Sequence, residues 1–176
     1  MNTWIALLRG INVGGKHIIP MKELVRLMEE NGFANVKTYI QSGNVVFQSP
    51  ARPGDEIGVL IAQKFGFKPD IFILSEKELK TAMANNPYEP DLGKNVHFFF
   101  CDREDPPIDV EFLESLRAPS EEYTLTGNVF YLHAPEGIGR SKMVEKLGKA
   151  FPREVSMTAR NLNTMNKLLE MIDANL

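Results

Sequence analysis

A nine-residue pattern occurs twice in this chain, and the two occurrences are 84 positions apart. Tyr39–Phe47 reads YIQSGNVVF, and Tyr123–Tyr131 reads YTLTGNVFY. The same offset aligns Asp70–Leu74 with Glu154–Thr158. A repeat that keeps its register across the intervening helical segment indicates an internal duplication, so we expect two copies of one folding unit.

The first copy alternates between segments of strand length and segments of helix length. The apolar run Trp4–Leu8 is typical of a strand buried on both faces. Pro20, followed by apolar residues at i, i+3 and i+4, predicts a helix that ends near Gly32. Two short strands joined at Gly43-Asn44 predict a two-residue hairpin turn. The strands of that hairpin are expected at 37–42 and 45–48, followed by a helix through 57–65 and a strand at 70–74.

The second copy has the same kinds of element in the same order. We expect a first unit at residues 1–84, which ends with a linking helix, and a second unit at residues 85–176, which ends with the C-terminal helix. The order β-α-β-β-α-β in each copy predicts an α+β protein of tandem ferredoxin-like (alpha-beta plait) units with antiparallel sheets. The elements expected in the second unit are strand 96–100, helix 109–116, a hairpin over 122–132 turning at Gly127-Asn128, helix 140–150, strand 154–158 and helix 161–172.

The first strand of each copy is apolar on both of its faces. Trp4–Leu8 has no polar residue, and Val96–Phe100 is interrupted only by His97. A free-standing antiparallel sheet with helices on one face alternates apolar and polar residues. The open sheet faces are therefore expected to be covered, most simply by each other in a helix-sheet-sheet-helix sandwich, with a homodimer that uses the same faces as the alternative.

Composition limits the class of protein and its partners. The net charge of −3 lacks the overall basic character of a nucleic-acid-binding protein, although it leaves room for a local basic patch. Cys101 is the only cysteine, which excludes an internal disulfide and is typical of a reducing compartment. The apolar runs are about strand length and no secretory signal is visible, so we expect a cytoplasmic protein without a membrane segment.

The glycine-rich loop after the first strand is expected to meet the first hairpin at one edge of the sheet. In this order of elements the first and second strands run in the same direction, so the segments that leave them lie at the same end. Backbone N–H groups of glycines, with Arg and Lys beside them, are the components of an anion-binding nest. The equivalent edge of the second copy, 101–107, is acidic and has no glycine. The residues predicted to bind a small anion are Arg9, Gly10, Asn12, Gly14, Gly15, Lys16, Ser42, Gly43 and Asn44.

Gly10–Lys16 also matches the first part of a nucleotide-binding P-loop, G-x-x-x-x-G-K. However, His17 stands where Ser or Thr would hold Mg²⁺, and the next helix is expected to begin only near Pro20. These departures argue against a nucleoside-triphosphate P-loop. Two interpretations remain, a phosphate or carboxylate nest that needs no magnesium and a plain glycine-rich connection with a solvated lysine.

A second polar cluster, Thr158–Thr164, lies at the entry to the final helix. Asn161 or Asn163 can cap that helix, and Arg160 can hold a carboxylate from the other copy. We favour this structural interpretation because Asn before an apolar periodic run is a common helix start. Capping does not itself require Arg160, so a ligand-binding role for Arg160 and Asn161 stays open.

Metal binding and thiol chemistry have little support in the sequence. His17, His97 and His133 lack the spacing of metal ligands. Cys101 precedes Asp102, whose charge raises a thiol pKa, so we do not expect a nucleophile there. The sequence therefore supports no metal, and it names neither a reaction nor a cofactor.

Three segments resemble the bacterial domain-of-unknown-function 1697 family. They are ALLRGINVGGK at Ala6–Lys16, TYIQSGNVVF at Thr38–Phe47 and RNLNT at Arg160–Thr164, and together they extend over nearly the whole chain. The resemblance implies tandem ferredoxin-like units and no activity. Leu162 stands where a tryptophan is expected in the family pattern, so no aromatic stacking role carries over to it. The residues that match motif positions, without assigned roles, are Arg9, Asn12, Lys16, Ser42, Asn44, Arg160 and Asn161.

These observations lead to the hypothesis of a cytosolic protein that binds a small anionic ligand at the glycine-rich edge of the first copy. Arg9 and Lys16 would supply charge, while backbone N–H groups, Ser42 and Asn44 would orient the ligand. Binding of RNA or single-stranded nucleic acid is one alternative, because RNA-recognition domains share this topology. The acidic net charge and the lack of an RNP1-like run argue against it. A protein–protein interaction module is the other alternative, and the sequence leaves both monomer and homodimer open.

Overall fold

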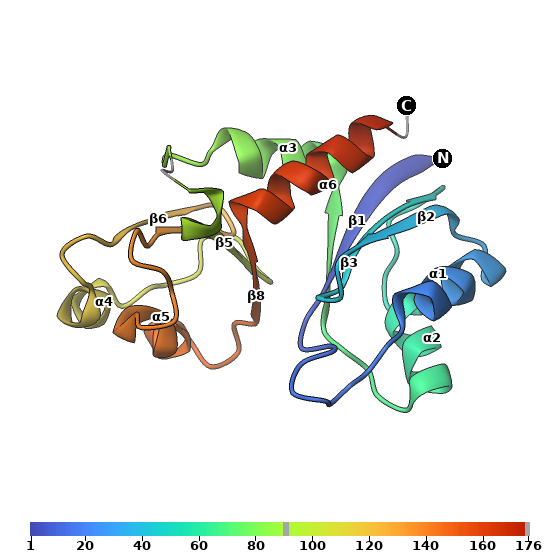
Figure 1. Cartoon of the computed structure of the whole chain (residues 1–176), viewed down its shortest axis with the longest axis horizontal. Helices are drawn as coiled ribbons and strands as arrows, with labels where there is room; N and C mark the ends of the chain where they lie inside the picture. The colour runs from blue at the N-terminus through green and yellow to red at the C-terminus, as the bar shows by residue number, and fades with distance from the viewer. Residues whose placement is uncertain (90–91, 175–176) are drawn as a thin grey trace. The chain divides into compact units, whose positions relative to one another are not determined.

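The structure of the chain is a computed structural model, which describes residues 1–89 and 92–174 (Figure 1). The chain forms two compact units. Unit 1 combines Met1–Thr81 with Asn166–Leu176, and unit 2 is Ala82–Met165.

The division into units differs from the expected boundary between residues 84 and 85 in one respect. The second half of the C-terminal helix groups with unit 1, whereas the whole helix was expected in the second unit. Leu168 and Ile172 in that half have no exposed surface, and Asp173 lies 3.8 Å from Lys80 of unit 1. The pair of Asp173 and Lys80 joins the end of the helix to α3 (Glu76–Ala84).

Unit 1 is built on a four-stranded antiparallel sheet with the strand order β2-β3-β1-β4. This order, with one helix after the first strand and one after the third, is the ferredoxin-like arrangement. The elements are β1 (Asn2–Leu8), α1 (Met21–Glu30), β2 (Ala34–Tyr39), β3 (Asn44–Ser49), α2 (Glu56–Phe65), β4 (Ile71–Ser75) and α3 (Glu76–Ala84), the last of which continues into unit 2.

Unit 2 repeats this arrangement with the strand order β6-β7-β5-β8. The predicted α+β fold of tandem ferredoxin-like units is therefore confirmed. The elements are η1 (Gly93–Asn95), β5 (Val96–Cys101), α4 (Val110–Leu116), β6 (Glu122–Thr126), β7 (Val129–His133), α5 (Lys142–Glu145), η2 (Leu147–Ala150), β8 (Met157–Asn161) and α6 (Leu162–Ala174).

Equivalent hydrogen bonds in the two copies show that the sequence separation between equivalent residues is not 84 everywhere. The last residue of β1 donates from Leu8 N to Gly43 O, and the last residue of β5 donates from Cys101 N to Asn128 O. The hairpin positions Gly43 and Asn128 are thus equivalent and 85 residues apart, one more than the sequence pattern suggests.

The offset between the two copies is larger still at the strand that follows the second helix. Arg9 N donates to Asp70 O, and Asp102 N donates to Ser156 O, so these equivalent positions are 86 residues apart. The expected strand 154–158 is accordingly found later, as β8 (Met157–Asn161). The expected helix 140–150 is also interrupted, because the backbone leaves the helical conformation at Lys146 and continues as the 3-10 turn η2.

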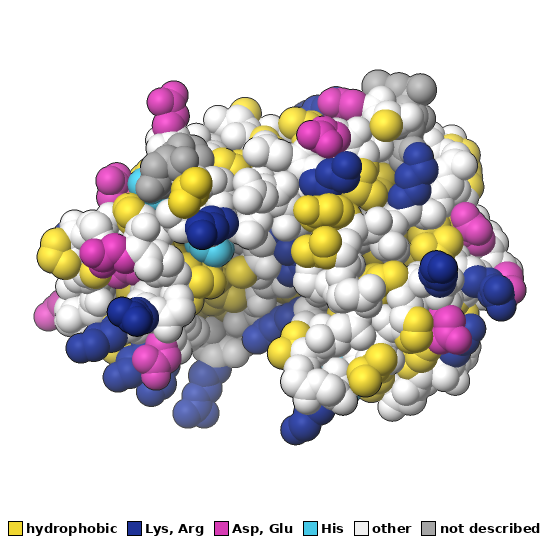
Figure 2. All heavy atoms as spheres, viewed as in Figure 1, with side chains coloured by type: hydrophobic (Ala, Val, Ile, Leu, Met, Phe, Trp, Pro, Cys, Tyr) yellow, Lys and Arg dark blue, Asp and Glu magenta, His cyan; other side chains and the backbone are white. Residues whose placement is uncertain are grey.

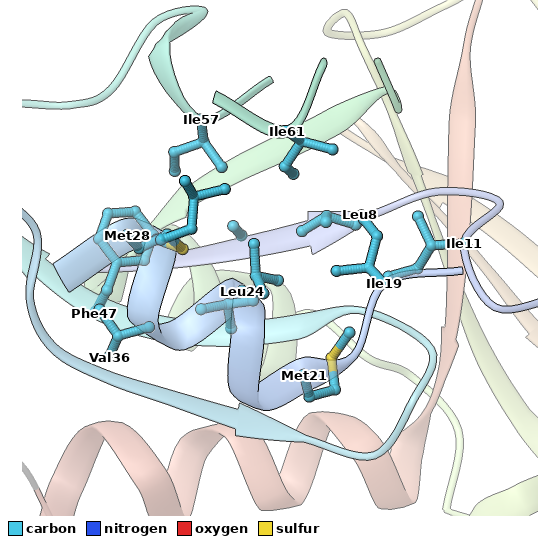
Figure 3. Close-up of a cluster of buried hydrophobic side chains, with 13 residues drawn as sticks. Leu8, Ile11, Ile19, Met21, Leu24, Met28, Val36, Phe47, Ile57 and Ile61 are labelled. Atoms are coloured by element: carbon cyan, nitrogen blue, oxygen red, sulfur yellow. The ribbon is translucent and has the colours of Figure 1, made fainter. Parts of the chain in front are cut away.

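The core of unit 1 lies between the sheet and the helices α1 and α2 (Figure 3). Alternate residues of a strand point to opposite faces, so Ala6 and Leu8 of β1 join Val45 and Phe47 of β3 on the helix side. The helices contribute apolar side chains at helical spacing, among them Leu24, Met28, Ile57 and Ile61.

The opposite face of each sheet is buried as well. In unit 1, Ile5, Leu7 and Val46 have no exposed surface. In unit 2, Phe98 and Tyr131 have none either, whereas Phe99 and Phe130 pack on the helix side. The expectation that both faces are covered is confirmed, and mutual coverage of the two sheets stays a prediction.

Leu7→Ala should lower the free energy of unfolding by about 2–5 kcal/mol, because it removes a buried leucine from the second face of the sheet. Urea unfolding followed by circular dichroism measures the change. Val13→Ala is the matched control, since Val13 is 66% exposed and its truncation should change stability by less than about 0.5 kcal/mol. Equal effects of the two substitutions would contradict burial of that face.

Candidate functional site

The glycine-rich loop and the first hairpin meet at the end of β1. Leu8 N donates to Gly43 O over 2.8 Å, and Arg9 N donates to Asp70 O over 2.9 Å. Ile11 and Ile19, near the two ends of the loop, point into the core beside Leu8 and are 1% and 0% exposed (Figure 3). The predicted meeting of these segments at one sheet edge is therefore confirmed, and the exposed part of the loop is held from both ends.

The tip of the loop is a small β-hairpin of its own. Val13 and Lys16 form an isolated antiparallel bridge, with Lys16 N donating to Val13 O over 3.1 Å. The two residues between them, Gly14 and Gly15, have φ of +60° and +70°. A turn with two positive φ values in succession is the type I′ turn that favours glycine. Helix α1 begins only at Met21, so the loop lacks the adjoining helix of a P-loop.

Asn12 is the residue that fixes this loop. Its Nδ2 donates to Ile19 O over 3.0 Å and to Gln41 O over 2.8 Å, and its Oδ1 accepts from Ile19 N over 2.8 Å. Both amide protons are thereby used. Asn12 was predicted to contact the ligand, and the structure gives it a framework role that joins the loop to the hairpin.

The loop of the first hairpin is longer than predicted, and the hairpin packs tightly against β1. Tyr39 pairs with Asn44, so the loop consists of the four residues 40–43 instead of a two-residue turn at Gly43-Asn44. The two-residue turn occurs only in unit 2, where Thr126 pairs with Val129. Asn44 is therefore not a turn residue but the first residue of β3, where it pairs with Leu7.

Gly43 and Asn44 serve the framework of the hairpin. A Cβ on Gly43 would lie 2.8 Å from Leu8 Cβ, and its φ is +90°. Asn44 has no exposed surface, and its Nδ2 donates to Tyr39 O and to Ser42 Oγ, each over 3.0 Å. Of the hairpin residues predicted to bind the ligand, only Ser42 is exposed.

Two cations stand at the exposed side of this edge. Arg9 Nη1 lies 3.8 Å from Asp70 Oδ2, and the two side chains are 52% and 63% exposed. A surface pair of this kind contributes only about 0–1 kcal/mol, so Arg9 can exchange Asp70 for another anion. Lys16 is exposed, and its side chain forms no ion pair with any residue that the structure describes. The ring of the next residue, His17, stacks on Phe67 with centroids 4.4 Å apart.

Backbone strain is concentrated at the same edge. Three of the five non-glycine residues with positive φ in the described chain lie here, namely Asn12 at 54°, His17 at 52° and Ile40 at 52°. A positive φ is a genuine outlier for a β-branched residue such as Ile40, whose side chain is also 52% exposed. Strain of this kind costs about 1–3 kcal/mol per residue and clusters at functional sites.

Comparison with known families identifies the chain. The model for "Protein of unknown function (DUF1697)" matches residues 1–131. The chain belongs to this family. A solved structure, the conserved bacterial protein SP0830 from Streptococcus pneumoniae, is similar with a TM-score of 0.66 and 25% identity, covering 97% of this chain and 98% of that one. Comparison with the curated proteins finds no match.

The family match covers the glycine-rich loop and the hairpin but ends before the second polar cluster. Asn161 Oδ1 accepts from Thr164 N over 2.9 Å, which confirms that Asn161 caps α6. Arg160 is 8% exposed, and its Nη1 donates to Thr158 Oγ1 over 2.9 Å and to Ala159 O over 2.8 Å. Burial lowers the pKa of Arg160 to about 10, so it remains charged at neutral pH. Both residues belong to unit 2.

The thiol and the buried histidine are poor candidates for chemistry. Burial, reinforced by Asp102, raises the pKa of Cys101 to about 11, so the thiol stays protonated at neutral pH. His97 is 7% exposed, and burial lowers its pKa, which favours the neutral ring. In the described part of the chain, no three His, Cys, Asp or Glu residues gather as metal ligands, and no helix has the length and apolar character to cross a bilayer.

One cavity was not foreseen from the sequence. It has a volume of about 630 Å³ and lies in unit 1 between the end of α1, the end of β3 and the start of α2. Its walls include Phe33, Val59 and Leu60, with Arg52 and Glu56 among the polar residues. No residue of the glycine-rich loop lines it, and no sequence motif distinguishes its residues from ordinary helix and strand ends.

Alanine substitutions at two glycines distinguish the cost of a steric contact from the cost of a strained backbone conformation. Gly10→Ala should cost about 1–3 kcal/mol, because its φ of +71° is strained for alanine although nothing lies within 4 Å of the new Cβ. Gly43→Ala should cost about 1–3 kcal/mol more, since its Cβ also collides with Leu8. Chemical unfolding of both variants measures the difference, and equal losses would show that the hairpin does not press on β1.

Proposed function

We propose that unit 1 binds a small anionic ligand, carrying a phosphate or carboxylate group, at the edge formed by loop 9–18 and hairpin 40–43. The observation that carries the proposal is the exposed Gly14-Gly15 turn next to Lys16, in a loop that begins at Arg9. Both glycines have open space around them, and their N–H groups donate to no residue within the described chain. Free N–H groups beside Lys and Arg attract anions.

The roles within the proposed site differ from residue to residue. Lys16 and Arg9 would supply charge, and the N–H groups of Gly14 and Gly15 would point at the anion. Ser42 stands at the exposed rim of the hairpin. Asn12, Gly43 and Asn44 hold the loop and hairpin in place through their own contacts, and this pre-organisation reduces the entropy lost on binding.

The alternative of RNA binding on the sheet has less support. RNA-recognition domains stack bases on exposed aromatic side chains of the sheet. In unit 1, Ile5 and Leu7 of the central strand β1 stand on the face without α1 and α2, and they have no exposed surface. An anionic ligand at the sheet edge needs no access to that face.

A thermal-shift screen tests the proposal. Inorganic phosphate, pyrophosphate, sugar phosphates, nucleotides and small carboxylates are compared on the native chain and on Arg9→Ala/Lys16→Ala. A ligand at 100 times its Kd stabilises the native state by about 2.7 kcal/mol, which raises Tm by several degrees for a chain of this size. The shift should disappear in the double variant, because that variant lacks both cations of the edge.

Lys22→Ala/Arg26→Ala is the matched control, since it removes one Lys and one Arg from the exposed surface of α1. The control should keep the full shift. A shift that survives in Arg9→Ala/Lys16→Ala, or the absence of a shift with every compound, would overturn the proposal.

A further inference from the structure

A second charged surface lies in unit 2, on residues 140–153, which we call the basic segment. All five of its cations are exposed, and none of their side chains forms an ion pair or hydrogen bond with a described residue. Glu145 is the only acidic residue of the basic segment. The five cations are Arg140, Lys142, Lys146, Lys149 and Arg153.

The fold places these cations on the outside because the residues between them are core residues. Met143, Leu147, Ala150 and Phe151 are between 0% and 6% exposed and belong to the core of unit 2. The basic side chains alternate with these anchors along α5, η2 and the turn that follows. Figure 2 shows the result as dark-blue side chains gathered around α5, at the lower left of the view.

The backbone of this surface is accessible as well. Three glycines lie within or directly before the basic segment, namely Gly137, Gly139 and Gly148. A Cβ built on any of them would meet nothing within 4 Å. No side chain therefore covers the backbone at these three glycines, although Gly137 N already donates to Ala134 O over 2.8 Å.

The charge of the chain is strongly segregated. The basic segment carries a net charge of +4, so the remaining residues carry −7 within a total of −3. At physiological ionic strength charges are screened over about 8–10 Å, so a partner in contact with the segment responds to the local charge rather than to the total. With the exposed Glu136 and Glu154 that flank the segment, residues 136–154 carry five cations and three acidic residues, a net charge of +2. The local charge is therefore positive although the net charge of the chain is negative.

We propose that the basic segment binds the phosphate backbone of a nucleic-acid duplex without reading its sequence. Lys, Arg and backbone N–H groups are the donors that contact phosphates. Phe151 is the only aromatic residue of the segment and is 6% exposed, so the segment offers no platform for stacking unpaired bases. No large apolar side chain of residues 140–153 is exposed, and Ile138, between Gly137 and Gly139, is 37% exposed. One such side chain is little apolar surface to enter a bilayer, which favours a duplex over a membrane.

Fluorescence anisotropy with labelled RNA and DNA duplexes tests the proposal. Five phosphate contacts predict a slope of log K against log salt of about −4.5, which is a loss of about 500-fold in affinity between 50 and 200 mM salt. Lys142→Gln/Lys146→Gln/Lys149→Gln leaves two cations, so its slope should fall to about −1.8. Lys22→Gln/Lys64→Gln/Lys77→Gln is the control, because it makes the same change in net charge with exposed lysines of unit 1.

The proposal predicts duplex binding that the control keeps at full affinity and that the segment variant weakens, with unchanged Tm for both variants. Absence of duplex binding at 50 mM salt would overturn it, as would equal losses in the two variants. Tighter binding to polyglutamate would identify an acidic protein as the partner instead, and binding to anionic vesicles but not to duplexes would identify a membrane.

Discussion

The edge of unit 1 depends on the close contact between Gly43 and Leu8. The hairpin lies directly on the end of β1, with an N–H···O bond of 2.8 Å and no room for a side chain at Gly43. Asn12 then connects the glycine-rich loop to Gln41 of the same hairpin. Two segments separated in the sequence thus form one exposed edge, and Ile40 and His17, both with positive φ, lie on it.

The two copies share the contact beneath this edge but differ in the segments that form the surface. Both copies keep the hydrogen bond between the end of the first strand and the hairpin, since Cys101 N donates to Asn128 O in unit 2. In unit 1 the hairpin loop has four residues, and the loop after β1 contains glycines and cations. In unit 2 the turn has two residues and faces an acidic segment, where Glu104 occupies the space beside Gly127. The fold was kept while the surfaces diverged.

The fold could be predicted from the sequence because hydrophobic periodicity and repetition report directly on strands, helices and their order. The meeting of loop and hairpin followed from that order alone. The length of the first hairpin could not be predicted, because Gly43-Asn44 is a good turn pair by local preference and the pairing of Asn44 with Leu7 overrides it. The interruption near Lys146 was missed for a similar reason, since the basic and apolar residues of 140–150 also fit a continuous helix.

The sequence predicted the meeting of the loop and the hairpin better than it predicted the roles of their residues. Asn12 and Asn44 are polar and lie near the glycines, so the sequence placed them with the ligand, whereas their amides satisfy backbone carbonyls of the framework. Asn161 is the opposite case, because its position before an apolar run predicted the cap that it forms. Asn44 bonds within its own hairpin and Asn12 bonds both its own loop and Gln41, and residue type alone does not show whether an amide turns to the backbone or to a ligand.

A titration with pyrophosphate followed by amide ¹H–¹⁵N NMR spectra tests the central claim most directly. The account predicts saturable shifts at the amides of Gly14, Gly15 and Lys16, with much smaller changes in the core strands of unit 1. Shifts centred on the cavity beside Phe33, or no saturable shifts in unit 1, would contradict it.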